Sequence, residues 1–213
     1  MSGAGAAMQR AIAGRGGAPM STEQVAALAD LTARVRELNE MVVYTDVDLA
    51  EVAAVRDEVA ALTARLAAVR REHPPVAENA AEGPARQLAG PVSGLLNPVA
   101  PPVDIRVLPD GTARAEFSVN VLYEGPPSFV HGGVSAMILD QLLGVAAAAN
   151  GTPGMTAKLD LRYRRPTPYG VPLVAEGRAT GSDGRKTFAD ARIIGPDGRT
   201  TVEATAMFVM PSR

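Results

Sequence analysis

The chain has 213 residues, a formal net charge of -2, no cysteine and two histidines. The nearly balanced charge gives no global basic field of the kind that nucleic-acid-binding domains carry. The absence of cysteine from the sequence excludes disulfides and thiolate-bound zinc, and two histidines are too few for a multi-histidine metal site. This length is enough for one sizeable core, or for one domain with an appendage.

Residues 1–20 are small, rich in glycine and weakly basic, and we expect them to be disordered. They lack the continuous apolar core of a signal peptide. The longest apolar run, residues 134–149, is interrupted by Asp140 and Gln141, which makes it too short and too polar to span a bilayer. We therefore expect a cytoplasmic protein with no integral membrane segment.

Residues 21–72 carry a helical pattern that begins with a capping box, Ser21-Thr-Glu-Gln24. Two series of apolar residues follow at alternating spacings of three and four: Leu28, Leu31, Val35, Leu38 and Val42, then Val52, Val55, Val59, Leu62, Leu66 and Val69. The series change phase near residues 44–48, where Thr45 or Asp46 is a candidate cap for a fresh helix. This predicts either a helical hairpin or one long helix with a local irregularity. Its expected role is packing or oligomerisation; docking of a specific partner is the alternative.

Residues 73–103 form a predicted linker, because repeated prolines remove amide donors and disfavour both helices and central strands. Residues 104–213 form the predicted folded domain. Apolar and polar residues alternate over 113–121, which is typical of a half-buried strand. One apolar helix is expected over 132–150, followed by strands over 155–165, 172–180, 185–194 and 200–210. Turn sequences at 181–184 and 195–198 separate the last three strands.

The predicted helix decides the fold class. It is apolar nearly all round, so it needs burial nearly all round. An antiparallel sheet wrapped around one central helix provides that burial, which predicts an α+β domain with an N-terminal helical hairpin or long helix. One such sheet leaves an edge and part of the helix uncovered, so we expect a homodimer or homotetramer.

Two features of this helix point to chemistry. Asp140 is a carboxylate in an apolar helix with no Lys or Arg within one turn, and such perturbed carboxylates concentrate at functional sites. His131-Gly132-Gly133 opens the same helix, where free amides form an anion site that suits a developing oxyanion. Structural interpretations stay open: Asp140 as a cap for another element, and His131 as a hydrogen-bonding core residue.

These features together resemble a known family. Tyr123-Glu-Gly-Pro-Pro-Ser-Phe-Val-His131-Gly-Gly, with Asp140 nine residues after the histidine, resembles hotdog-fold thioesterases of the phenylacetate-pathway type and, more closely, thioesterase superfamily members that act on fatty acyl-CoA. The likeness continues through three further stretches: residues 156–166, 184–186 and 203–208. It covers about half of the chain, and the N-terminal helices and linker lie outside it. The resemblance implies a hotdog fold and hydrolysis of acyl-CoA to a free acid and CoA, with no metal or organic cofactor.

By position, the resemblance implies that the Gly132 amide binds the thioester carbonyl and that Asp140 acts as general base or nucleophile. Thr156 would hold Asp140 or the attacking water, and His131 would shape the site beside the oxyanion donor. Gly133 would let the substrate approach the helix start.

Basic residues are implied near the CoA phosphates. Arg185 and Lys186 are the candidates, with an ordinary solvated turn as the alternative, and Arg162, Arg164 and Arg165 are weaker ones. Gly125 is a departure, because some relatives have an asparagine six residues before the histidine to bind the thioester or water.

Two other functions compete with hydrolysis. A non-catalytic acyl-CoA-binding or sensing module is the first, but the retained Asp140 favours catalysis and the acidic N-terminal helices offer no basic recognition helix for DNA. A hotdog dehydratase or hydratase is the second, and it would need a catalytic histidine in a different arrangement. The domain has no Gly-x-Ser-x-Gly sequence and no second histidine, which disfavours serine-hydrolase chemistry.

Overall fold

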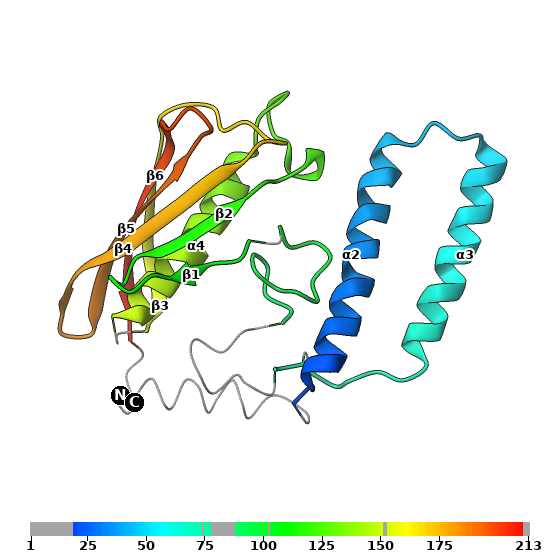
Figure 1. The fold of residues 1–213 in the computed structure, drawn as a ribbon, viewed down its shortest axis with the longest axis horizontal. Helices are drawn as coiled ribbons and strands as arrows, with labels where there is room; N and C mark the ends of the chain where they lie inside the picture. Colours follow the sequence, from blue (N-terminus) through cyan, green and yellow to red (C-terminus); the bar gives the residue numbers. More distant parts are fainter. Residues whose placement is uncertain (1–18, 74, 78–87, 102, 151–152, 211–213) are drawn as a thin grey trace.

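A computed structural model describes residues 19–73, 75–77, 88–101, 103–150 and 153–210 (Figure 1). Residues 1–18, most of the segment expected to be disordered, lie outside the described residues. The helices are α2 (Thr22–Tyr44), α3 (Leu49–Ala67) and α4 (Gly132–Ala149), with a short 3-10 helix, η1 (Val121–Tyr123). The strands are β1 (Arg106–Val107), β2 (Ala113–Phe117), β3 (Met155–Tyr163), β4 (Leu173–Asp183), β5 (Lys186–Ile194) and β6 (Thr200–Val209).

The six strands form one antiparallel sheet in the order β1-β2-β4-β5-β6-β3, and α4 lies across one face of it (Figure 1). Apolar residues alternate along β2, β4, β5 and β6, so one face of each strand meets the helix. The helix buries one side against them, with Ser135, Ile138, Leu139, Leu142, Leu143, Ala146 and Ala147. This arrangement is the hotdog fold, and the predicted fold class is confirmed.

Close contact between helix and sheet depends on Gly177 in β4. A Cβ atom there would lie 2.8 Å from Leu142 Cδ2 and 2.7 Å from Ala191 Cβ. The expectation that residues 134–149 are too short and too polar to span a bilayer is wrong as a statement of length and composition, because α4 is the one helix within the described residues that is long and apolar enough to cross a membrane. Seven residues of α4 are buried against the sheet, so its length and apolar composition are those of a core helix.

Local differences from the expected strands arise at turns and bulges. β4 runs on to Asp183, so its hairpin loop is Gly184-Arg185 rather than the whole of 181–184. A register shift between Ala179 and Gly181 lengthens the strand, and Gly184 has a φ of 57°, which favours glycine. The two-residue strand β1 was not expected from the pattern.

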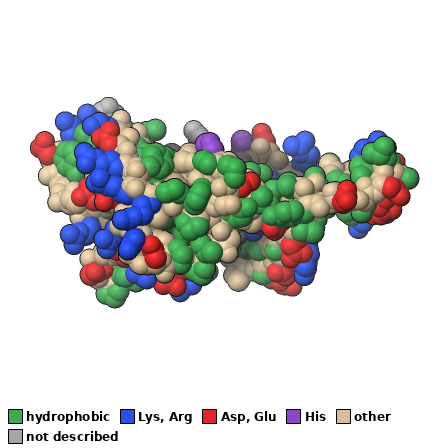
Figure 2. All heavy atoms as spheres, turned by 90° about the horizontal axis from the view of Figure 1, so that it is seen from above, with side chains coloured by type: hydrophobic (Ala, Val, Ile, Leu, Met, Phe, Trp, Pro, Cys, Tyr) green, Lys and Arg blue, Asp and Glu red, His purple; other side chains and the backbone are tan. Residues whose placement is uncertain are grey.

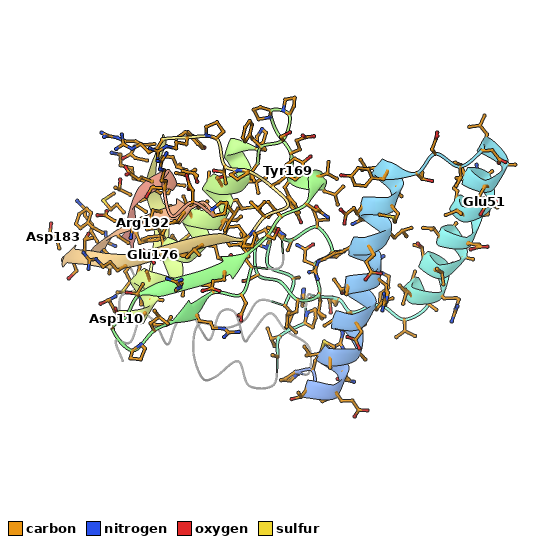
Figure 3. All side chains as sticks on the ribbon, turned by 45° about the horizontal axis from the view of Figure 1, so that its top comes forward. Glu51, Asp110, Tyr169, Glu176, Asp183 and Arg192 are labelled. Atoms are coloured by element: carbon orange, nitrogen blue, oxygen red, sulfur yellow. The ribbon has the colours of Figure 1, made fainter. Side chains whose placement is uncertain are left out.

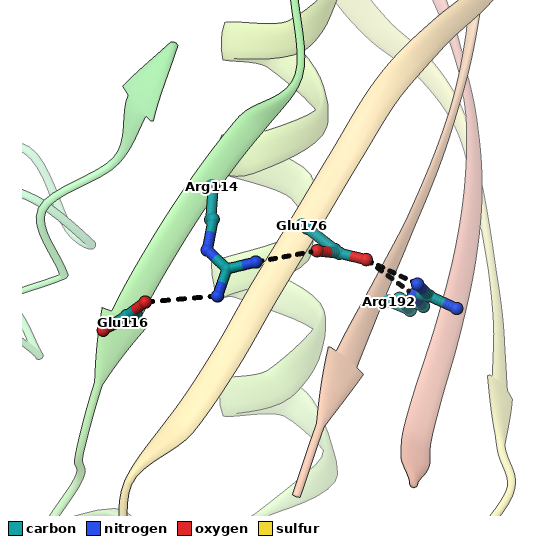
Figure 4. Close-up of polar contacts among 4 residues, drawn as sticks. All are labelled: Arg114, Glu116, Glu176 and Arg192. Atoms are coloured by element: carbon teal, nitrogen blue, oxygen red, sulfur yellow. Dashed lines mark hydrogen bonds and ion pairs between the residues drawn. The ribbon is translucent and has the colours of Figure 1, made fainter. Parts of the chain in front are cut away.

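The outer face of the sheet is polar and carries a charge network across three strands (Figures 3 and 4). Glu176 of β4 accepts hydrogen bonds from Arg114 of β2 at 3.2 Å and from Arg192 Nε of β5 at 3.0 Å. Arg114 also contacts Glu116 at 3.1 Å. Solvent weakens such ion pairs, so the network adds little to the stability of the fold. Its charged side chains make this face of the sheet compatible with contact with water.

The N-terminal segment is a hairpin of two separate helices. Ser21 and Gln24 form the predicted capping box. Asp48 caps α3 by accepting from the Glu51 amide at 2.9 Å, whereas Thr45 ends α2. The expected cap at Thr45 or Asp46 is therefore wrong, because the backbone stays extended at Thr45 and the four residues 45–48 form the connection.

Part of the predicted linker belongs to the folded domain. Leu88, Val92, Ala100 and Val103 are buried, and Val92 and Val103 join the core cluster around α4. Proline fixes the backbone of this segment without preventing its apolar side chains from packing. Arg36 of α2 reaches the same segment, donating to the carbonyl oxygens of Gly94 at 3.2 Å and Asn97 at 2.8 Å.

Candidate active site

The first turn of α4 is capped by a side chain from the sequence His131-Gly-Gly. His131 is the N-cap, and its Nδ1 accepts a hydrogen bond from the Gly133 amide at 3.0 Å. Nδ1 is the acceptor in this contact, so that ring nitrogen carries no proton there. His131 therefore caps the helix start, and the Gly133 amide is already engaged.

The Gly132 amide is the donor left at this helix start. An amide at the first position of a helix has no intrahelical partner, and none is found for it among the described residues. Gly132 is half-buried, at the positive end of the helix dipole. This is the geometry of a single-amide oxyanion donor.

Tyr163 of β3 fixes Gly132 in place, and sequence reasoning missed it. The Tyr163 hydroxyl donates to the Gly132 carbonyl oxygen at 2.9 Å. A Cβ atom on Gly132 would lie 3.2 Å from that hydroxyl oxygen and 3.3 Å from two ring carbons. Gly132 is thus needed for the approach of Tyr163 as well as for access of a ligand. The only signal in the sequence was a tyrosine at the end of a strand, which is ordinary.

Asp140 and Thr156 lie together, so that the middle of α4 meets the start of β3. The Thr156 hydroxyl donates to Asp140 Oδ1 at 2.9 Å, and Asp140 is half-buried. The second carboxylate oxygen, Oδ2, accepts no hydrogen bond from the described part of the chain. The resemblance placed Thr156 in this position, and the structure brings the two side chains together.

A β-bulge explains how Thr156 reaches the helix. Lys158 and Asp160 form an exposed ion pair at 2.7 Å on the outer side of β3, and Leu159 and Leu161 pack toward the core. Strict alternation would put Thr156 on the outer side with Lys158. The pairing of β3 with β6 shifts register between Thr156 and Lys158, and one extra residue reverses the alternation.

The loop before His131 is tied down at both ends. Glu124 Oε1 accepts from the Ser128 amide at 2.7 Å, and the His131 amide donates to the Tyr123 carbonyl oxygen at 2.8 Å. Ser128 has a φ of 72°, a conformation that is strained for a residue with a side chain.

Partial burial raises the pKa of Tyr169 (labelled in Figure 3), and the nearby Glu124 carboxylate raises it further.

The departure at Gly125 has a steric cause. A Cβ atom on Gly125 would lie 2.7 Å from His131 Cα and 3.1 Å from His131 Cβ. An asparagine would therefore require the loop to shift. In this chain the backbone at Gly125 packs against His131 and leaves no room for a Cβ atom.

The predicted CoA-binding residues lie at one end of the sheet. Lys186 pairs with Val209, which pairs with Met155 at the start of β3, so Arg185 and Lys186 share the Thr156 end of the sheet. Both are exposed, and Arg185 donates to the Met210 carbonyl oxygen at 3.3 Å.

Two of the weaker arginine candidates are engaged elsewhere. Arg164 is bound to Glu203 at 2.8 Å, and its hydrogen bond lowers the pKa of that carboxyl. Arg165 donates to the Thr200 carbonyl oxygen at 3.3 Å, whereas Arg162 is exposed on β3.

The structure divides the predicted residues into two groups. His131, Gly132 and Gly133 gather at the start of α4 beside Tyr163, and Asp140 meets Thr156 farther along. Eight residues of continuous helix separate Gly132 from Asp140, or ~12 Å at ~1.5 Å per residue. One copy of the chain therefore does not bring the oxyanion donor to the carboxylate. No group of three or more His, Asp or Glu side chains that could hold a metal occurs in the described ranges.

This fold and site define a hotdog domain with a carboxylate on its central helix. A family model described as the thioesterase superfamily matches residues 128–202. A crystal structure described as a thioesterase superfamily protein is 36% identical and superposes with a TM-score of 0.77, covering 85% of this chain and 94% of that one. The chain belongs to the thioesterase superfamily, as the resemblance predicted.

The same comparison extends the likeness beyond the hotdog domain. Residues 88–210 are well under two thirds of the chain, so a match over 85% of it also includes residues before 88. The likeness to this one structure therefore includes part of the N-terminal segment, whereas the family model stays within residues 128–202, as expected.

Curated relatives match over a shorter stretch. Acyl-coenzyme A thioesterase THEM4 of Xenopus laevis is 36% identical over 87 residues, which is 40% of this chain and 39% of that protein. The Mus musculus protein of the same name is 38% identical over 87 residues, or 37% of its length. The match thus spans about two fifths of these relatives.

Proposed function

We propose that this chain hydrolyses acyl-CoA thioesters, converting acyl-CoA and water to a free acid and CoA. The observation that carries the proposal is the Thr156–Asp140 hydrogen bond. It orients the carboxylate through one oxygen and leaves the other for chemistry, on a helix that begins with an unengaged Gly132 amide. The names of the curated relatives, acyl-coenzyme A thioesterases, support the same substrate class.

Two routes are open to the carboxylate. As a general base, Asp140 takes a proton from water while the water oxygen attacks the thioester carbon; the oxyanion forms at the Gly132 amide, and the C–S bond then breaks with return of the proton to sulfur. As a nucleophile, Asp140 attacks the carbon itself, CoA leaves, and water hydrolyses the mixed anhydride. Label in the Asp140 carboxylate after a single turnover in ¹⁸O-water would demonstrate the second route, with water attacking the anhydride at the Asp140 carbonyl carbon; label in the product acid alone fits either route.

We further propose that the site is shared between two copies. Strand β3 is the edge of the sheet, and seven of its nine residues are exposed. An unpaired edge of this length favours pairing with another strand. If two β3 strands pair antiparallel about a two-fold axis, the Tyr163 end of one lies beside the Thr156 end of the other. Gly132, bound to Tyr163, then faces the partner's Asp140, which removes the ~12 Å gap.

Basic residues support CoA as the carrier. Arg185 and Lys186 lie at the Thr156 end of the sheet with exposed side chains. Cations at that end suit the phosphates of CoA, while the acyl group would extend along α4. A non-catalytic acyl-CoA-binding module remains the second candidate, because the same contacts would bind the thioester without cleaving it.

A thiol-release screen over CoA esters of different acyl groups tests the proposal. We expect turnover of at least one ester by the unmodified chain and none by the Asp140→Asn variant, with binding of that ester retained by both. Binding without turnover in the unmodified chain would instead assign the sensing function. The acyl groups that react best would identify the substrate class, aliphatic or aromatic.

A further inference from the structure

Helix α3 exposes an apolar face that its own chain does not cover. None of its residues is buried, and within the described residues it makes no extensive contact with another helix or strand. Exposed fractions of the apolar side chains are high: Val52 45%, Val55 37%, Val59 37%, Leu62 52%, Leu66 61% and, just past the helix end, Val69 92%. Figure 1 shows α3 on the far side of α2 from the sheet. We call these six residues the α3 seam.

The spacing of the α3 seam has a symmetry that suits self-association. The steps between its members are three, four, three, four and three residues, so the series reads the same from either end. Two antiparallel copies therefore meet layer by layer: Val52 with the partner's Val69, Val55 with the partner's Leu66, and Val59 with the partner's Leu62. The two-fold axis falls between residues 60 and 61.

Charge along the same helix favours the antiparallel direction. The charge is acidic around its start, with Asp46 and Asp48 in the connection before it and Glu51, Asp57 and Glu58 within it, against one Arg56. The charge is basic around its end, with Arg65 within the helix and Arg70 and Arg71 just past it, against one Glu72. Antiparallel copies place each acidic half beside a basic half, and Glu58 then flanks the partner's Arg65; parallel copies would place like charges together.

The turn that joins α2 to α3 is consistent with an acidic start of α3. Viewed from above, the turn between α2 and α3 presents mainly hydrophobic and acidic side chains (Figure 2), and Glu51 lies near the first turn of α3 (Figure 3). Tyr44, Val47 and Leu49 are 58%, 50% and 86% exposed there. An apolar stripe with acidic flanks on one half and basic flanks on the other fits a second copy of itself.

We propose that α3 is an assembly helix that packs antiparallel against α3 of a second copy of this chain through the α3 seam. This contact is separate from the β3 edge. If a copy uses its β3 edge with one partner and its α3 seam with another, the assembly grows beyond a dimer. If both contacts join the same two copies, the assembly stays a dimer. The inference does not depend on the proposed enzymatic activity.

Disulfide trapping tests the contact, because the chain has no cysteine of its own. Val55→Cys and Leu66→Cys variants, one carrying a size tag, are mixed and oxidised gently. We expect a disulfide between the two variants and little within either one alone, because two copies of residue 55 lie ~16 Å apart along antiparallel axes. An Ala64→Cys variant, on the opposite side of α3, is the matched control and should react slowly with each.

Other outcomes overturn the proposal. Rapid Val55→Cys homodimers would mean parallel helices, and the absence of any seam disulfide would mean that α3 does not meet α3. A second measurement uses charge: Val59→Glu with Leu62→Glu should weaken association at least tenfold in sedimentation, whereas Ala64→Glu should not. Equal association by both variants would contradict the proposal. Thiol release by either variant reports separately on the active site.

Discussion

Helices α3 and α4 are both rich in alanine and branched aliphatic residues, yet they have opposite surroundings. α4 buries seven residues against the sheet, and α3 buries none. The two also treat carboxylates differently: Asp140 of α4 is held by a threonine from a neighbouring strand, whereas Asp57 of α3 pairs with the adjacent Arg56 in water. Apolar content alone therefore does not decide burial. The strands of the sheet cover α4, whereas no strand in the described part of the chain covers α3.

The largest expected effect contrasts the two carboxylates. Asp140→Asn should lower thiol release by about 10²- to 10⁴-fold, because the amide can neither accept the proton nor attack carbon. Asp57→Asn, the same change on α3, should leave the rate unchanged. Both variants should retain the unmodified circular dichroism spectrum. Unchanged turnover in Asp140→Asn would contradict its catalytic assignment.

A second pair of variants measures how differently the helices are packed. Leu142→Ala should lower the free energy of unfolding of the hotdog domain by about 2–5 kcal/mol, because the side chain is fully buried between α4 and the sheet. Leu62→Ala should change it by less than about 0.5 kcal/mol at concentrations where copies do not associate. Urea denaturation gives both values. Similar losses would mean that α3 packs on the domain.

The link between α4 and β3 should contribute a smaller effect. Thr156→Val removes the hydroxyl that orients Asp140, and we expect kcat to fall about 10- to 100-fold, as for a lost hydrogen bond to a charged group. Thr156→Ser keeps the hydroxyl and should recover most of the rate. If the serine variant is as slow as the valine variant, the methyl group rather than the hydrogen bond is what matters.

The smallest effect on catalysis is expected from removing the helical hairpin. A chain that begins at residue 88 keeps the buried Leu88 and Val92 and loses α2 and α3. Its kcat/KM should stay within about tenfold of the full chain, ~1.4 kcal/mol, because α2 touches η1 and the 94–97 segment but not the α4–β3 pair. Light scattering should show a smaller assembly. Complete loss of activity in a folded dimer would place the helices in the active site.

Periodicity and turn chemistry predicted much of the fold. The central helix was expected over residues 132–150 and occupies Gly132–Ala149, and its apolar surface correctly implied a sheet around it. The capping box at Ser21 was equally readable, since its geometry is local. Burial of Leu88, Val92 and Ala100 was not, because nothing local distinguishes a proline-rich linker from a proline-rich segment that packs into a core.

The site was predictable in its residue types but not in its geometry. A carboxylate in an apolar helix and glycines at the helix start are visible in one sequence. The approach of Thr156 depends on a bulge that reverses strand alternation, and the role of Tyr163 depends on which strand lies beside α4. The loss of side-chain space at Gly125 depends on a loop crossing His131. These contacts join residues far apart in the chain, so local patterns do not encode them.

Subunit complementation tests the central claim, a catalytic site with its carboxylate on one copy and its oxyanion donor on the other. Asp140→Asn chains are mixed with Gly132→Pro chains, which lack the donor amide. His131 already has the extended backbone that precedes proline, and proline is favoured at the first helical position, although Tyr163 must shift by a few tenths of an ångström. After confirmed subunit exchange, half of the dimers are mixed and each holds one intact site, so activity should return to about a quarter of that of the unmodified chain. No recovery from folded, exchanged subunits would contradict the shared site.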